Sequence, residues 1–509
     1  MYTTPQSVVG RRHPCRRFVI LTLALALPLA ACSHARAQQP DGDYEGEHTY
    51  KQPDGKVVPI TESKPARSKI ASVLRAGKAT TAEEEKHFTD HFRYHLAAMT
   101  WKENVTSLPD MRKKMKNYLG QAGRGAAPDL HDRLNKWILE DFEKVAKDAR
   151  YPRAIRLNCV LMIGDLDQRE AAIGGPAEVP LPVAEPVLFG LFNDENQHAA
   201  LRIEALRGLM RHAEHTLTPD QRNELLAAAV KLIKAPQPPA GKSAVGHMWM
   251  RMLSCATVSI LAGKGAEANQ PAVVDALQAL IADKTAPLWL RCYSANTFGS
   301  LQAKAFGENK VLPLAQQLAG LVVEVAQTND RLMEEAGVDA NKKKAKAPPK
   351  PPVPGESEEE DAEADRPAIP ESLLKVAADD VAADLIYVYY GLTGADLNDR
   401  DAKPSQTHSL FGAAGQDAKP FVNDLVARIE GMLSKLKDPK KELHEQLADI
   451  STDGGELQAW LKQQGASVEP KPETVVKPSD AKPATRPAPG AAVGQPAGNA
   501  SATESAVNR

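Results

Sequence analysis

Four arginines recur along the middle of the chain in the same local context, and this repeat constrains the fold more than any other feature. Each follows an apolar residue, and neighbouring copies stand about 40–50 residues apart. A small residue lies three positions after each arginine, and an apolar residue lies seven positions after it. A fixed period of this length is typical of helix pairs that stack one on the next. The repeated dipeptides are Ile155-Arg156, Leu201-Arg202, Met250-Arg251 and Leu290-Arg291.

Side chains able to cap a helix stand eight positions before each arginine, namely Asp148, Asp194, Ser243 and Asp283. Helical periodicity between the arginine segments predicts the first helix of each pair. The third copy departs from the pattern, because a serine replaces the aspartate and a Pro-Gln-Pro-Pro loop precedes it. The expected first helices span residues 129–147, 183–192, 219–234 and 271–282.

The arginine-centred pattern resembles the second helix of a HEAT repeat over about residues 128–302, a third of the chain. The resemblance implies that aspartate and arginine tie one repeat to the next and that the small residue permits close helix packing. A compact helical bundle would show the same periodicity, but the fixed offsets favour a solenoid. The tying residues would be Asp148, Arg156, Asp194, Arg202, Arg251, Asp283 and Arg291.

The first residues have the pattern of an export signal. A basic region precedes an apolar stretch at 18–29, which is too short to span a bilayer. Leu29-Ala30-Ala31-Cys32 resembles a lipobox, so we expect a bacterial lipoprotein that is lipidated at Cys32 and faces the periplasm or cell surface. Ala35-Arg36-Ala37 leaves an alternative, a soluble periplasmic or secreted protein released by ordinary cleavage.

No motif for catalysis or cofactor binding emerges. Gly241-Lys242-Ser243 ends like a phosphate-binding loop, but Pro236 occupies the position of its first glycine. His444-Glu445 begins like a zinc-protease helix, but Ala448 replaces the second zinc ligand. The formal net charge of −2 provides no basic field for nucleic acid. We therefore expect no enzyme, no cofactor and no nucleic-acid partner.

One segment could carry metal chemistry. His87, His91, His95 and Met99 follow one another at four-residue intervals, which forms a ladder along one side of a helix. Histidine and methionine are ligands for zinc or copper. His87 and His95 are about 12 Å apart along the helix axis, so only an adjacent pair can hold one ion. The alternative is that the histidines flank an apolar stripe as packed or solvated residues.

Composition divides the chain into folded and low-complexity parts. Residues 338–367 carry a lysine run, prolines and then a run of acids, and the last residues are rich in Ala and Pro. The predicted parts are a lipoprotein signal peptide (1–31), a flexible tether (32–63), N-terminal helices (64–127), HEAT-like repeats (128–302), a further helix of the body (303–337), a disordered insert (338–367), C-terminal helices (368–465) and a disordered tail (466–509).

Together these features predict an all-α protein built as an α-α solenoid of HEAT-like helix pairs, with a disordered linker, insert and tail. The first functional hypothesis is a membrane-anchored extracytoplasmic scaffold that binds a protein or peptide partner. The alternative hypothesis is a metal-handling protein that uses the histidine ladder.

Overall fold

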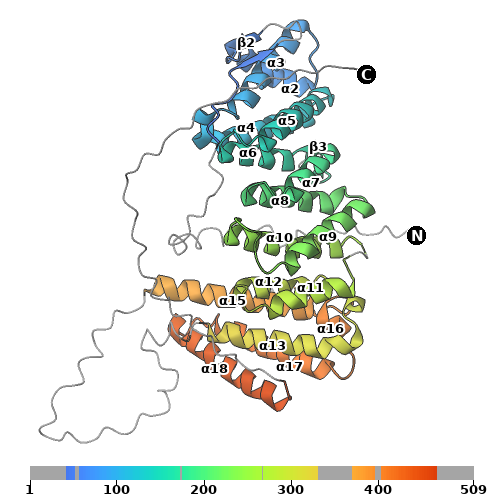
Figure 1. The fold of residues 1–509 in the computed structure, drawn as a ribbon, viewed down its shortest axis with the longest axis vertical. Helices are drawn as coiled ribbons and strands as arrows, with labels where there is room; N and C mark the ends of the chain where they lie inside the picture. Colours follow the sequence, from blue (N-terminus) through green and yellow to red (C-terminus); the bar gives the residue numbers. More distant parts are fainter. Residues whose placement is uncertain are drawn as a thin grey trace, which may run out of the picture. The chain divides into compact units, whose positions relative to one another are not determined.

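The computed structural model describes residues 42–51, 57–171, 175–265, 268–328, 330, 370–395 and 403–466, and this part of the chain is all-α with two short hairpins. It belongs to one compact unit that ends at Ala466 (Figure 1). Cys32 and the signal segment, the predicted insert at 338–367 and the tail from residue 467 lie outside the described residues. No described helix is both long enough and apolar enough to cross a membrane.

The helices lie close to the ranges that periodicity predicts. The four expected first helices are present, although the one predicted from residue 183 begins at Glu185 after a short 3-10 turn. The α-helices are α2 (Lys64–Ala76), α3 (Ala82–Ala98), α4 (Leu108–Gly123), α5 (Asp129–Lys147), α6 (Arg153–Gly164), α7 (Glu185–Asn193), α8 (Ala199–His215), α9 (Pro219–Lys234), α10 (Ala244–Ala262), α11 (Pro271–Ala282), α12 (Leu288–Phe298), α13 (Val311–Gln327), α15 (Glu371–Thr393), α16 (Ser409–Ala413), α17 (Lys419–Lys435) and α18 (Leu443–Gln463).

Short elements join these helices. The 3-10 turns are η2 (Lys102–Ser107), η3 (Pro182–Ala184), η4 (Ala303–Ala305) and η5 (Glu308–Lys310). Strands β1 (Thr49–Lys51) and β2 (Val57–Pro59) pair antiparallel, with Tyr50 opposite Val58. Strands β3 (Asp167–Arg169) and β4 (Val179–Pro180) form a second antiparallel hairpin between α6 and α7.

Successive helix pairs stack in chain order (Figure 1). The pairs are α5 with α6, α7 with α8, α9 with α10, and α11 with α12. The second helices form one layer, because α6 packs on α8, α8 on α10, α10 on α12 and α12 on α15. On the other side, α9 packs on α11 and α11 on α13. Helices α13 and α15 thus continue both layers, although residues 328–370 separate them in the chain.

Small side chains are buried at equivalent positions of the second helices. The residue three positions after each repeat arginine is fully buried in all four copies: Cys159, Ala205, Ser254 and Ser294 are 0% exposed. Where α15 crosses α12, a β-carbon on Gly391 would lie 2.1 Å from the carbonyl oxygen of Ala295. No other residue type fits there, so the packing of these two helices depends on this glycine.

Residues 42–51 and 57–63 lie within the predicted flexible tether and are among the described residues, and the first of these segments contacts the helical body. The backbone N–H of Tyr44 donates to the carbonyl of Arg150 at 3.0 Å, and the Trp101 indole donates to the carbonyl of Glu47 at 2.9 Å. The His48 ring also stacks on Trp101 with centroids 4.5 Å apart. Sequence composition missed this segment, because its order comes from contacts with the helical body and not from local periodicity.

The aspartates of the repeat do not begin the second helices, so their assignment as caps at that position is wrong. Asp148, Asp194 and Asp283 are each the C-terminal cap of the first helix. Their carboxylates accept hydrogen bonds from backbone N–H groups two residues later, at 2.9–3.0 Å. Ser243 alone is a true N-cap, because its hydroxyl accepts from Gly246 N at 3.2 Å.

The third copy is therefore aligned incorrectly in the sequence repeat. The structural counterpart of the three aspartates is Ala235, the C-cap of α9, and not Ser243. The Pro-rich loop at 236–243 lengthens the connection between α9 and α10. Ser243 aligns with the three aspartates in the sequence only because the inserted loop ends in a residue that also caps a helix.

Candidate functional site

Each of the four repeat arginines donates an equivalent hydrogen bond to a backbone carbonyl near the end of the preceding helix. Arg156 Nε donates to the Ala146 carbonyl at 3.0 Å, and Arg202 Nε donates to the Phe192 carbonyl at 2.9 Å. The equivalent acceptor for Arg291 Nε is Ile281, at 2.8 Å. Arg251 uses Nη2 to reach the Ile233 carbonyl at 3.1 Å. Each acceptor lies two residues before the C-cap of the preceding helix, so each arginine ties the two helices of its own pair together.

Links between neighbouring repeats vary in chemistry. Arg251 pairs directly with Asp283 of the next repeat at 3.3 Å. Arg156 instead donates to the Gln197 side chain, which donates to Asp194 at 3.1 Å.

Arg291 reaches Glu324 on α13, with Nη–Oε distances of 2.6 and 3.1 Å. Arg202 would meet Ala235 at the aspartate position, where no carboxylate exists. Asp148 pairs with Arg150 in its own loop at 2.6 Å. A direct aspartate–arginine ion pair between repeats thus forms only at Arg251 among the four repeat arginines. A glutamine mediates the contact of Arg156, and a glutamate replaces the aspartate at Arg291.

The histidine ladder lies on α3 and is buried. The His87 Nε2 atom lies 3.2 Å from the Glu83 carboxylate, one turn earlier. His91 is 1% exposed, and neither of its ring nitrogens has a hydrogen-bond partner among the described residues. The His95 ring lies edge-on to His91 with centroids 4.4 Å apart. Met99 caps the end of α3, where its backbone N–H donates to the His95 carbonyl at 3.2 Å.

Burial keeps the two central histidines neutral. It lowers the pKa of His91 to about 4, and the positive charges of Lys114 and Arg67 act in the same direction. Burial likewise lowers the pKa of His95 to about 3, assisted by His91, Lys114 and Arg67. Neutral imidazoles can ligate metals. The adjacent positive charges, however, disfavour a cation at this position.

The described residues contain no group of three or more His, Cys, Asp or Glu side chains placed to hold a metal ion. Lys114 Nζ lies 3.4 Å from His95 Nε2, so the ring nitrogen that faces α4 already has an ammonium neighbour. The metal role of His87, His91, His95 and Met99 stays a prediction.

A cavity of about 230 Å³ adjoins the C-terminal half of the ladder. His95 and Met99 line it from α3, and Lys114, Met115 and Tyr118 line it from α4. The sequence analysis predicted two of these residues as ligands and did not identify α4 as the opposite wall. The i, i+3, i+4 spacing of Met111, Lys114, Met115 and Tyr118 is the signal that marks that wall.

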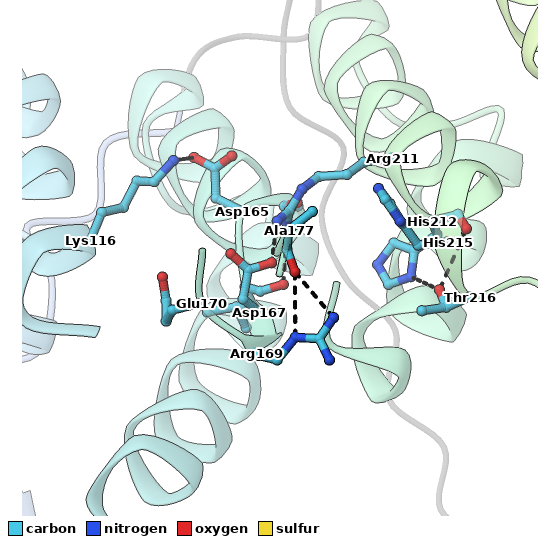
Figure 2. Close-up of polar contacts among 12 residues, drawn as sticks. Lys116, Asp165, Asp167, Arg169, Glu170, Ala177, Arg211, His212, His215 and Thr216 are labelled. Atoms are coloured by element: carbon cyan, nitrogen blue, oxygen red, sulfur yellow. Dashed lines mark hydrogen bonds and ion pairs between the residues drawn. The ribbon is translucent and has the colours of Figure 1, made fainter. Parts of the chain in front are cut away.

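A second cavity of about 410 Å³ lies where α4, α8 and the β3–β4 hairpin meet. Figure 2 shows its ion pairs: Lys116 with Asp165 at 2.9 Å, and Arg211 with Asp167. Burial raises the pKa of Asp167 to about 6, although Arg211 opposes the shift. A third carboxylate of the cavity, Glu170, lies 3.2 Å from His131 Nε2. Arg211 and His131 join the hairpin to α8 and α5, and Lys116 joins α4 to the end of α6, which is a structural role.

Two tryptophans lie side by side on the layer of second helices. Trp249 and Trp289 each stand two positions before a repeat arginine, and their ring centroids are 6.1 Å apart. Trp289 is 37% exposed, and Val245, one turn before Trp249, is 49% exposed. The equivalent positions in the first two copies are Ala154 and Ala200. We call Val245, Trp249 and Trp289 the tryptophan patch.

The chain matches no protein-family model and no curated protein. Its candidate sites therefore rest on geometry alone.

Sequence reasoning missed the tryptophan patch. The signal was present, because both tryptophans hold the same offset from a repeat arginine. A repeat stacks equivalent positions next to one another, so residues at one offset form a continuous row across neighbouring helices.

Proposed function

We propose that this protein is a scaffold that binds a protein or peptide partner through a solenoid of HEAT-like helix pairs. Support for the solenoid comes from the pairwise stacking in chain order and from the arginine bond that recurs in four successive pairs. Stacked repeats present extended surfaces of equivalent positions, and such surfaces are suited to binding other chains.

The tryptophan patch is the observation that carries the proposal. Tryptophan is enriched among the residues that dominate the energy of protein interfaces. Here two indole rings and a valine are partly exposed together, although each helix had buried positions available one residue away, such as Met250 and Leu290. A patch of this kind gives a partner an apolar anchor.

We further propose that the scaffold is exported and held at a membrane by a lipid on Cys32, facing the periplasm or the cell surface. The support is the lipobox at the end of the apolar signal stretch.

The test is quantitative affinity capture from native membranes with the tagged chain, compared with the double variant Trp249→Ala/Trp289→Ala. We expect the variant to lose at least tenfold of the specifically captured partner, since tryptophans at an interface centre each contribute about 2 kcal/mol or more. Retention of the same partner at the same yield would refute the patch as the binding surface.

A matched control is Val183→Ser. Val183 is also an exposed apolar residue, at 62%, but it lies in η3 and outside the second helices. This variant should capture the partner as the wild type does. Circular dichroism of all variants should show the same helical content, so that a lost partner reports the surface and not the fold.

A further inference from the structure

The cavity beside the histidine ladder opens to solvent and is lined by both polar and apolar side chains. Its deep wall is apolar and carries sulfur, because Met99 and Met115 are buried there, and the rings of Tyr94 and Tyr118 also face it. A cavity of about 150 Å³ lined by apolar side chains holds a benzene molecule. At about 230 Å³, this one accommodates a single ring with one short substituent.

The charges around the cavity are predominantly positive. Lys114 lines it and forms no ion pair with a described carboxylate, and its nearest hydrogen-bonding neighbour is the neutral His95 at 3.4 Å. Arg67 adds a second positive charge that acts on Lys114 and Tyr118. The carboxylate of Glu62 at the cavity lies 3.9 Å from Arg67. The Glu62 carboxylate also acts electrostatically on Lys114, but no described carboxylate lies within ion-pair distance of the Lys114 ammonium.

We propose that this cavity binds a small organic monoanion, a carboxylate attached to one aromatic ring. The carboxylate would bind the Lys114 ammonium, and the ring would pack on Met99, Met115 and Tyr118. Methionine sulfur contacts aromatic rings favourably, which suits a ring in this position. Glu62 disfavours a dianion such as a phosphate monoester. The two cations disfavour a metal ion. This site does not depend on the tryptophan patch.

The experiment is calorimetric titration of the soluble chain beginning at Ser33 with phenylacetate at pH 7. A ligand of this size is expected to bind with a Kd of about 1–6 mM. Phenylacetamide has the same shape without the charge, and it should bind at least fivefold more weakly. This comparison needs no variant, so it holds whatever a substitution does to folding.

Lys114→Gln should weaken phenylacetate binding at least fivefold and leave phenylacetamide unchanged. The matched control is Lys113→Gln, because Lys113 is the preceding exposed residue of α4 and does not line the cavity. It should bind both ligands as the wild type does. His95 ring resonances should shift on titration, which places the ligand in this cavity.

Three results would overturn the proposal. The first is no binding of phenylacetate up to about 20 mM, well above the expected Kd. The second is equal binding of phenylacetate and phenylacetamide, or equal behaviour of the Lys113 and Lys114 variants. The third is zinc or copper binding that is abolished by His95→Gln and competes with phenylacetate, which would assign the cavity to the histidine ladder as a metal site.

Discussion

At the scale of the residue, one side chain type organises each helix pair. A guanidinium offers several N–H donors in a rigid plane, so it can bind a helix-end carbonyl and still reach the next repeat. Arg251 shows both uses, since it binds the Ile233 carbonyl and the Asp283 carboxylate. All four repeat arginines are buried. A lysine cannot replace them, because it has no second donor in a fixed direction.

Replacing Arg202 or Arg251 with Ala should destabilise the body by about 1–3 kcal/mol, because a buried carbonyl loses its charged donor. Arg207→Ala is the control, since Arg207 lies exposed on α8 and pairs only with Glu204 of its own helix. That change should cost less than about 0.5 kcal/mol. Urea unfolding measures all three variants. Equal midpoints for all would show that the arginine bond contributes nothing.

A second residue-scale prediction concerns acid stability. His212 on α8 is 0% exposed, and burial lowers its pKa to about 4, with Arg211 and His215 acting in the same direction. Between pH 6.5 and about pH 4, the unfolded state binds a proton that the folded state excludes. The stability contributed by neutral His212 is therefore complete above pH 6.5 and is lost as the pH falls toward 4, by about 2–3 kcal/mol.

The measurement is urea unfolding of the wild type and of His212→Gln at pH 7 and pH 4.5. The variant should lose about 2–3 kcal/mol less than the wild type over this interval. His444→Gln removes a half-exposed histidine on α18 and should keep the wild-type pH dependence. If His212→Gln is as acid-sensitive as the wild type, His212 does not titrate in this window.

At the scale of the element, the N-terminal hairpin segment shows how contacts override composition. Residues 42–51 are mostly polar, and neither they nor residues 57–63 show helical periodicity. Residues 42–51 nevertheless contact the start of η2 and the loop after α5. Tyr44 lies edge-on to Tyr151 with ring centroids 4.8 Å apart, and Arg150 lies over the Tyr44 ring. A short polar segment can be ordered when the folded body supplies the partners.

Tyr44→Ala should lower the stability of the body by about 1 kcal/mol, because the aromatic pair and the cation–π contact are both lost. Val57→Ser alters the same segment at an exposed site, 63% exposed, and should leave the melting temperature unchanged. Differential scanning calorimetry distinguishes the two outcomes. A flexible tether would make both variants indistinguishable from the wild type.

At the scale of the whole molecule, the proposed lipid anchor and the proposed binding surface lie in different parts of the chain. The proposed attachment to a membrane depends on the lipid at Cys32. Cys32→Ala should move the protein from the membrane to the soluble fraction, because acyl chains provide most of the attachment energy. Labelled palmitate should enter the wild type only. A variant that stays in the membrane, with an unlabelled wild type, would remove the lipoprotein proposal.

The sequence by itself determined the fold class and most helix boundaries. Periodic apolar positions predicted α5, α9 and α11 at the residues where they lie. The buried face of an amphipathic helix requires apolar residues at intervals of three and four positions, and these intervals can be read from the sequence. The repeat arginines were also visible, since equivalent contacts demand equivalent residues at equal intervals.

Only the tertiary structure decided which distant residues meet. The register of the third repeat depended on Ala235 capping α9, which a loop insertion concealed. The wall that Lys114 and Tyr118 form opposite His95 depended on how α4 packs beside α3, and the pairing of Trp249 with Trp289 depended on how α10 stacks on α12. Such contacts form between different helices, and the spacing of residues within one helix does not specify which other helix packs against it.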